Sequence, residues 1–134
     1  MSSGFDNLFS EGKIGDLNIR NRVVMPPMAT NFGDEDGSIT EKVKNYYAER
    51  AKGGTGLIIS ENFLVDSPDG KNVVREIRID DDKYIPELTE LAERVHNHGA
   101  KMFVQIHHAG RETTSGITEG IQPVSASSEK DEFL

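Results

Sequence analysis

Cysteine is absent from this sequence of 134 residues. Its absence excludes disulfides, thiolate-bound zinc, cysteine-ligated iron–sulfur clusters and a cysteine nucleophile. Long hydrophobic runs are absent as well, because no segment approaches the roughly 20 apolar residues of a membrane-spanning helix. Residues 1–6 also lack a basic region followed by an apolar run, which is the pattern of a secretory signal. We therefore expect a cytoplasmic protein that has no membrane partner.

Positive charge is scarce in the chain. There are 15 Lys and Arg residues against 23 Asp and Glu residues, which gives a formal net charge of −8 at pH 7. Proteins that bind nucleic acids rely on clustered Lys and Arg to contact phosphates, so we expect no nucleic-acid partner. The composition, with 35% hydrophobic and 28% charged residues, is typical of a globular protein. The length fits one ordinary domain.

The hydrophobic pattern predicts a hairpin, three strands and two helices. Apolar residues at helical spacing indicate the helices, and short apolar runs indicate strands buried in a sheet. The hairpin is predicted at residues 13–19, the strands at 22–25, 56–61 and 101–106, and the helices at 38–53 and 83–98. The alternation of strands and helices predicts an α/β fold, in which helices cover a parallel sheet.

Local signals define the ends of the predicted helices. The run Ser38–Glu41 fits the capping-box pattern, which begins the first helix at Ser38. Pro86 suits the first turn of the second helix, and Gly99 suits its end. Residues 66–82, which precede the second helix, form a polar segment longer than ordinary connections, so we predict a functional loop there.

Two segments begin as apolar strands and then break into small or polar residues. They are residues 21–31 (NRVVMPPMATN) and residues 105–111 (QIHHAGR). In an α/β fold, the ends of parallel strands are where ligand sites open. These two segments are therefore the candidate binding region.

Four blocks of sequence resemble the old yellow enzyme family of FMN-dependent oxidoreductases. The resemblance is to the branch of NADH:flavin oxidoreductases, enoate reductases and 2,4-dienoyl-CoA reductases. The blocks occur in the order and spacing of the family, and they are residues 17–28, 46–59, 105–111 and 123–127. Any one block alone is a weak signal, but the four together are specific.

The resemblance implies the N-terminal part of a (β/α)8 TIM barrel, incomplete in this chain. The matching part comprises the hairpin that plugs the barrel floor and about three βα units, without the third helix. Residues 1–111 are then a partial flavin oxidoreductase domain, and residues 112–134, rich in Ser, Thr, Gly and Glu, are expected to be a loop or disordered tail.

The resemblance also implies a flavin-binding surface with FMN as cofactor and NADH or NADPH as reductant. It places the backbone of Pro27, Met28 and Ala29 along the flavin ring and the backbone of Asn62 near its pyrimidine end. The Gln105 amide is expected to bond to the polar ring edge, because an amide can both donate and accept. Ala29 stands where many relatives carry Cys or Thr, and alanine cannot provide their hydrogen bond.

The activity implied by the family is reduction of an alkene conjugated to a carbonyl, so the expected partner is a small enone or enoyl substrate. The family's substrate-gripping His and Asn residues, its proton-donating Tyr and its phosphate-binding loops follow later in the barrel. We therefore assign no catalytic residue in this chain. Its unpaired strand edges predict a homo-oligomer or association with a complementing barrel segment.

Two other functions remain open from the sequence. One is a non-catalytic truncated remnant, or a self-associating interaction module without a complete flavin site. The other is a different α/β barrel that binds a phosphorylated metabolite, although the strand-end blocks match the flavin family better than a phosphate cradle. Bound yellow colour after purification would separate the flavin protein from both.

Three ionisable side chains near the predicted strand ends have alternative interpretations. Glu61 could be a general base, but we favour a structural carboxylate held by Arg or by backbone. Adjacent His107 and His108 point to opposite sides of a continuing strand, so they cannot share one metal. We predict no metal site, and we expect His108 to pack and hydrogen-bond around the strand end.

Overall fold

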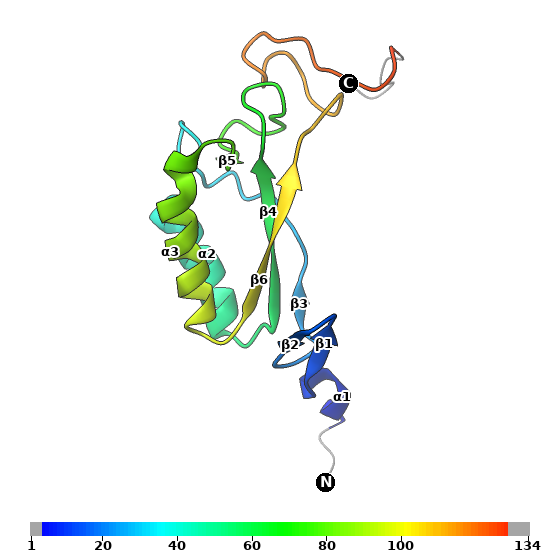
Figure 1. Ribbon diagram of the computed structural model, residues 1–134, viewed down its shortest axis with the longest axis vertical. Coiled ribbons are helices and arrows are strands. Elements are labelled where there is room, and N and C mark those ends of the chain that lie inside the picture. The colour runs from blue at the N-terminus through cyan, green and yellow to red at the C-terminus, as the bar shows by residue number, and fades with distance from the viewer. Residues whose placement is uncertain (1–3, 129–134) are drawn as a thin grey trace.

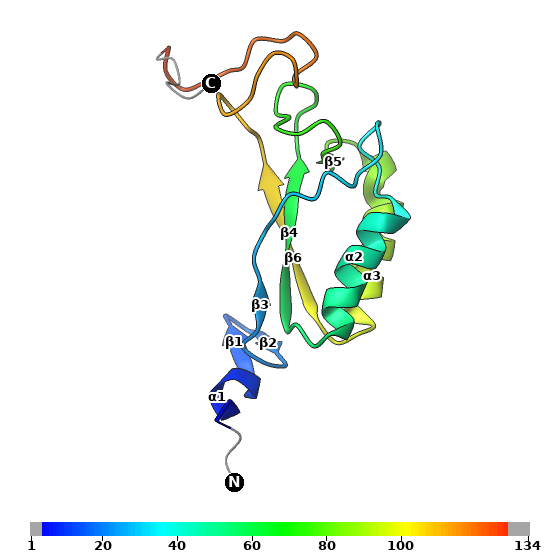
Figure 2. The same ribbon diagram turned by 180° about the vertical axis from the view of Figure 1, so that it is seen from behind.

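The computed structural model describes residues 4–128, which form an open sheet with two helices packed on one face (Figures 1 and 2). The elements in chain order are α1 (Asp6–Phe9), β1 (Gly12–Ile14), β2 (Leu17–Ile19), β3 (Val24–Met25), α2 (Glu41–Lys52), β4 (Leu57–Leu64), β5 (Ile77–Arg78), the 3₁₀ turn η1 (Asp82–Tyr84), α3 (Ile85–His96) and β6 (Lys101–His107). The α/β class, the hairpin, the three strands and the two helices are as predicted.

Strand β4 lies at the centre of the sheet and is parallel to its three neighbours. β6 pairs with β4 along its length, from Leu57 opposite Lys101 to Leu64 opposite His107. β3 pairs with the start of β4, and β5 pairs with its end. Because β6 occupies one edge of β4 throughout, β3 and β5 share the other edge. The sheet therefore leaves the far edge of β6 without a neighbouring strand among residues 4–128.

The hydrophobic core lies between the sheet and the two helices. Ile58 and Phe63 of β4 face α2 and α3 and are completely buried. The other buried core residues are Met25, Ile39, Val43, Tyr47, Ala51, Ile77, Leu91, Val95 and Ala100. The helices cover one face only, so the face on which a barrel would close remains open.

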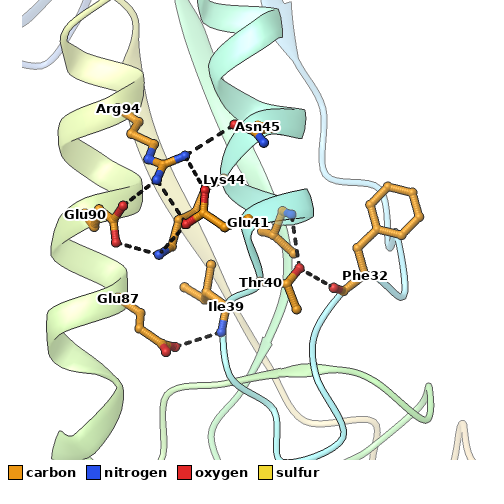
Figure 3. Close-up of polar contacts among 10 residues, drawn as sticks. Phe32, Ile39, Thr40, Glu41, Lys44, Asn45, Glu87, Glu90 and Arg94 are labelled. Atoms are coloured by element: carbon orange, nitrogen blue, oxygen red, sulfur yellow. Dashed lines mark hydrogen bonds and ion pairs between the residues drawn. The ribbon is translucent and has the colours of Figure 1, made fainter.

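The predicted start of the first helix is wrong by three residues. Helix α2 begins at Glu41, and its N-cap is Thr40, whose hydroxyl accepts a hydrogen bond from the Val43 N–H at 3.3 Å. The same hydroxyl donates to the Phe32 carbonyl at 2.7 Å, which ties the helix start to the preceding loop (Figure 3). The sequence pattern pointed to Ser38 because Glu41 stands three residues after it, as in a capping box, although Thr40 is also a favourable N-cap residue.

We expect Thr40→Ala to lower the free energy of unfolding by about 0.5 to 2 kcal/mol, the usual range for loss of an N-cap side chain. Thermal or urea unfolding followed by circular dichroism measures this change. Ser38→Ala is the matched control, since it removes the hydroxyl that the sequence pattern alone would have chosen. A larger loss for Ser38→Ala than for Thr40→Ala would contradict the cap assignment.

Helices α2 and α3 are joined by a network of ion pairs around a nearly buried lysine (Figure 3). The Lys44 ammonium is 2.5 Å from Glu90 and 3.2 Å from Glu41. Arg94 contacts the same two carboxylates, at 2.5 Å and 2.9 Å. The hydrogen bond from Lys44 is the main reason that the pKa of Glu90 lies below its ordinary value. The network connects the first half of α2 with α3.

The hairpin lies at the end of the sheet where β4 and β6 begin (Figure 1). β1 and β2 are antiparallel, with Ile14 opposite Leu17, and Gly15 has a positive φ of 55° in the turn. Arg20, just after the hairpin, donates to the carbonyls of Ala51, Thr55 and His98. These bonds fix the hairpin against the ends of both helices.

The two predicted loop regions, residues 66–82 and residues 112–134, contain more structure than the sequence indicated. The predicted polar loop 66–82 contains the short strand β5, which the sequence did not reveal, and the second helix starts as a 3₁₀ turn before α3. Residues 108–128 contain no helix or strand, yet Thr118 is completely buried and Lys71 pairs with Glu119 at 2.7 Å. Residues 129–134 of the predicted tail lie outside the described part of the chain.

No helix within residues 4–128 is long and apolar enough to cross a membrane. Over the same residues, no group of three or more His, Asp or Glu side chains is arranged to hold a metal ion.

Candidate functional site

The segment after β3 follows the edge of β4 but is not held by backbone pairing. β3 ends at Met25, and Pro26 and Pro27 have no N–H to donate to a ladder. Within the described chain, no bond between backbone groups engages residues 26–33. Met28 is 51% exposed and Ala29 is also exposed. The side chains of Met28 and Ala29 are therefore exposed, beside a backbone that no ladder holds within the described residues.

A β-bulge interrupts the pairing of β4 with β6 beside this segment. Ile59 is opposite Phe103, but the next paired residues are Asn62 and Gln105, so β4 contains one extra residue. Two hydroxyl groups satisfy the N–H groups at the bulge. The Gln105 N–H donates to Ser60 Oγ at 3.1 Å, and the Glu61 N–H donates to the Tyr47 hydroxyl at 2.7 Å.

The bulge brings two of the predicted site residues side by side. Ile58 faces the helices. In a regular strand Asn62, four residues later, would face the helices too, because side chains alternate between the two faces. The extra residue instead turns Asn62 to the open face, directly opposite Gln105. Both residues are half-buried. Neither a motif nor the hydrophobic pattern indicated this bulge.

Glu61 is buried at the bulge, and its carboxylate reaches the segment after β3. It accepts hydrogen bonds from the Thr30 N–H at 2.7 Å, from the Thr30 hydroxyl at 2.8 Å and from the Tyr47 hydroxyl at 3.2 Å. Burial raises the pKa of Tyr47 above its ordinary value, so the phenol stays protonated and remains a donor. The partners are a backbone N–H and two hydroxyls, so of the two expected partners, Arg or backbone, the structure shows backbone.

The two histidines at the end of β6 have separate partners. His107 Nδ1 is 2.7 Å from the buried carboxylate of Glu76, which also accepts from the Asn72 N–H at 2.8 Å. His108 Nδ1 accepts from the Gly110 N–H at 3.0 Å. His108 thus hydrogen-bonds at the strand end as expected, while His107 ties β6 to the loop before β5. Glu76, which sequence reasoning did not single out, is the anchor.

The open surface offers the hydrogen-bonding groups that a planar, polar-edged ring requires. Within residues 4–128, no hydrogen bond engages the side-chain amides of Asn62 and Gln105. The same holds for the backbone N–H groups of Met28 and Ala29. A flavin ring edge alternates carbonyl and N–H groups, and amides can match both. The residues present therefore fit the ring of a flavin, whereas Ala29 adds no side-chain hydrogen bond.

Comparisons with known proteins show the family of the chain. The profile of the NADH:flavin oxidoreductase / NADH oxidase family matches residues 7–133. The chain is 62% identical to the NADH oxidase of Thermoanaerobacter brockii over 130 residues, covering 97% of this chain and 20% of that protein. It is 40% identical to the NADH:acrylate oxidoreductase of Vibrio harveyi over 111 residues, covering 83% of this chain and 11% of that protein.

A solved structure, the old yellow enzyme homologue from Zymomonas mobilis, superposes with a TM-score of 0.83 at 31% identity. It covers 92% of this chain, and this chain covers 34% of it. The chain thus spans a fifth or less of the curated relatives named above and about a third of this solved structure. With the fold of the N-terminal part of a (β/α)8 barrel, the chain belongs to the NADH:flavin oxidoreductase / NADH oxidase family, that of the old yellow enzymes.

Proposed function

We propose that the surface made by Pro27, Met28, Ala29, Asn62 and Gln105 binds the ring of FMN. The observation that carries this proposal is the pairing of Asn62 with Gln105 on the open face, together with the nearby Met28 and Ala29, whose backbone N–H groups have no hydrogen-bond partner within residues 4–128. The amide of Gln105 would donate to and accept from the polar ring edge. The N–H groups of Met28 and Ala29 would provide further donors.

We further propose that this flavin surface serves an ene reductase. The chemistry that FMN supplies when bound is transfer of hydride from NADH or NADPH to the β-carbon of an alkene conjugated to a carbonyl. The name of the Vibrio harveyi relative supports this choice, because acrylate is an alkene conjugated to a carboxylate. In this proposal the residues of the flavin surface orient the ring, and we assign the proton donor to none of them.

Titration of isotopically labelled chain with FMN tests the ring surface directly. We expect NMR shifts at the Met28 and Ala29 amides and at the side-chain amides of Asn62 and Gln105. Binding should be weak, because ring contacts alone must offset the entropy of association. Shifts that are absent, or that fall on the helix side of the sheet, would contradict the proposal.

A chimera tests the activity. The matched segment of the Thermoanaerobacter brockii NADH oxidase is replaced by this chain, which is 62% identical to it. We expect the purified chimera to be yellow and to oxidise NADH when acrylate or a cyclic enone is added without oxygen. A chimera that binds flavin but reduces neither acceptor would contradict the ene-reductase assignment. A colourless, folded chimera would contradict the flavin surface itself.

We expect Gln105→Ala to weaken FMN binding to the chimera about fivefold, because one ring-edge hydrogen bond worth on the order of 1 kcal/mol is lost. The reduction potential of bound FMN should shift as well. Fluorescence titration and spectroelectrochemistry measure the two effects. Gln122→Ala, which truncates the same side chain at an exposed position, is the control. Equal affinities and potentials in both variants would remove Gln105 from the site.

A further inference from the structure

We propose that Glu61 is a positioning residue for the flavin surface. Its carboxylate fixes Thr30, and so the segment after β3, where no backbone ladder does so. The inference rests on the proposed function, and it adds a residue that touches no ring atom. Its basis is the route of the chain between β3 and α2, the burial of one carboxylate and the neutral donors around it.

The first step concerns how the segment after β3 is fixed. Residues 26–33 make no bond between backbone groups within the described chain, and two prolines remove donors at its start. Side chains must therefore hold it. Thr30 is bound at two atoms by one carboxylate, with Glu61 at 2.7 Å from its nitrogen and 2.8 Å from its hydroxyl. The Thr30 hydroxyl in turn accepts from the Phe32 N–H at 3.2 Å. Glu61 thus anchors the segment at the residue after Ala29.

The second step concerns why Glu61 points there. The bulge supplies one extra residue in β4, and Glu61 lies in the bulge. Its own N–H donates to the Tyr47 hydroxyl at 2.7 Å, and that hydroxyl donates back to its carboxylate at 3.2 Å. Because α2 carries Tyr47, the carboxylate is fixed from the helix side as well. One residue therefore connects the helix, the bulge and the flavin segment.

The third step concerns geometry at the surface. The bulge sets Asn62 opposite Gln105. Glu61, the residue before Asn62, binds Thr30, the residue after Ala29. The two halves of the proposed ring surface therefore share one support. A carboxylate this buried, with an exposed fraction of 3%, is costly unless donors satisfy it. The donors of Thr30 and Tyr47 satisfy this carboxylate, and the same hydrogen bonds join the segment after β3 to the bulge.

Hydrogen exchange tests the anchor without any flavin. In the 134-residue chain, we expect Glu61→Ala to speed exchange of the Thr30 amide about tenfold, which corresponds to loss of about 1.4 kcal/mol of protection. Exchange of the Ile58 amide, in the core of β4, should change much less. Glu61→Gln should recover most of the Thr30 protection, because its amide oxygen accepts from Thr30 and its NH2 can donate to Tyr47. Unchanged Thr30 exchange in Glu61→Ala would overturn the proposal.

FMN titration of the same variants tests the consequence. We expect Glu61→Ala to weaken binding roughly tenfold, corresponding to two modest hydrogen bonds, with Glu61→Gln between it and the parent. Glu93→Gln removes an exposed carboxylate and should leave binding unchanged. If Glu61→Ala does not fold, Thr30→Val takes its place, since it deletes the hydroxyl contacts with Glu61 and with the Phe32 N–H but keeps the bond from the Thr30 N–H to Glu61. Full affinity in the folded variants would overturn the positioning role, whereas no FMN response in the parent chain would instead overturn the proposed function.

Discussion

Replacing Phe63 by alanine is expected to leave most of the chain unfolded. Phe63 is completely buried between β4 and the helices, and its loss should cost about 3 to 5 kcal/mol. That range approaches the entire stability of a small domain. Phe63 also follows Asn62 directly, so the same ring holds the end of the bulge in place. Urea unfolding monitored by circular dichroism measures the effect.

Phe9→Ala is the matched control for this substitution. Phe9 is 62% exposed in α1, so the same side chain is removed where little apolar surface is lost from the core. We expect its unfolding midpoint to stay close to that of the parent chain. Similar midpoints for the two variants would show that Phe63 does not support the core as its burial indicates.

Self-association of the chain is the second large effect that we expect. β6 has a neighbouring strand on one edge only within residues 4–128, and its other edge carries free N–H and C=O groups. Ile106 on this strand is 71% exposed, and Phe103 and Val104 are partly exposed too. Such an apolar edge recruits another strand. Sedimentation velocity on the 134-residue chain should show dimers or larger species.

Ile106→Lys should shift this equilibrium strongly toward the monomer. A lysine on an edge strand places a charge where a second strand would dock, which natural sheets use to prevent pairing. Val74→Lys introduces the same charge at an equally open loop position, 61% exposed, and should leave association unchanged. A monomeric parent chain, or equal association in both variants, would contradict the role of the β6 edge.

The sequence was informative wherever hydrophobic spacing controls structure. The apolar run 56–61 predicted a buried strand, and β4 lies there. The helical spacing of Val43, Tyr47 and Ala51 predicted the buried face of a helix, and all three are buried in α2. The five predicted flavin contacts came from the family resemblance, and the structure places Asn62 and Gln105 opposite one another. Their contact with FMN stays a prediction.

Other features depend on contacts between residues far apart in the sequence. β5 has two residues and is defined by its pairing with Phe63 and Leu64, so no local pattern could indicate it. The bulge in β4 depends on hydroxyls from Ser60 and Tyr47 that replace ladder partners. Thr40 prevailed over Ser38 as the N-cap because its hydroxyl also reaches the Phe32 carbonyl. These are outcomes of tertiary packing, which sequence spacing does not encode.

The central place of β4 also determines the order in which the chain can fold. Every parallel pairing in the sheet uses β4, and its partners lie far away in sequence, as with Leu57 and Lys101. Contacts of this kind require closure of long loops, which slows folding relative to local helix contacts. The helices can form early in folding, but no parallel pair of strands can form before β4 takes part in it. Substitutions in β4 should therefore slow folding, whereas substitutions on the outer edge of β6 should mainly speed unfolding.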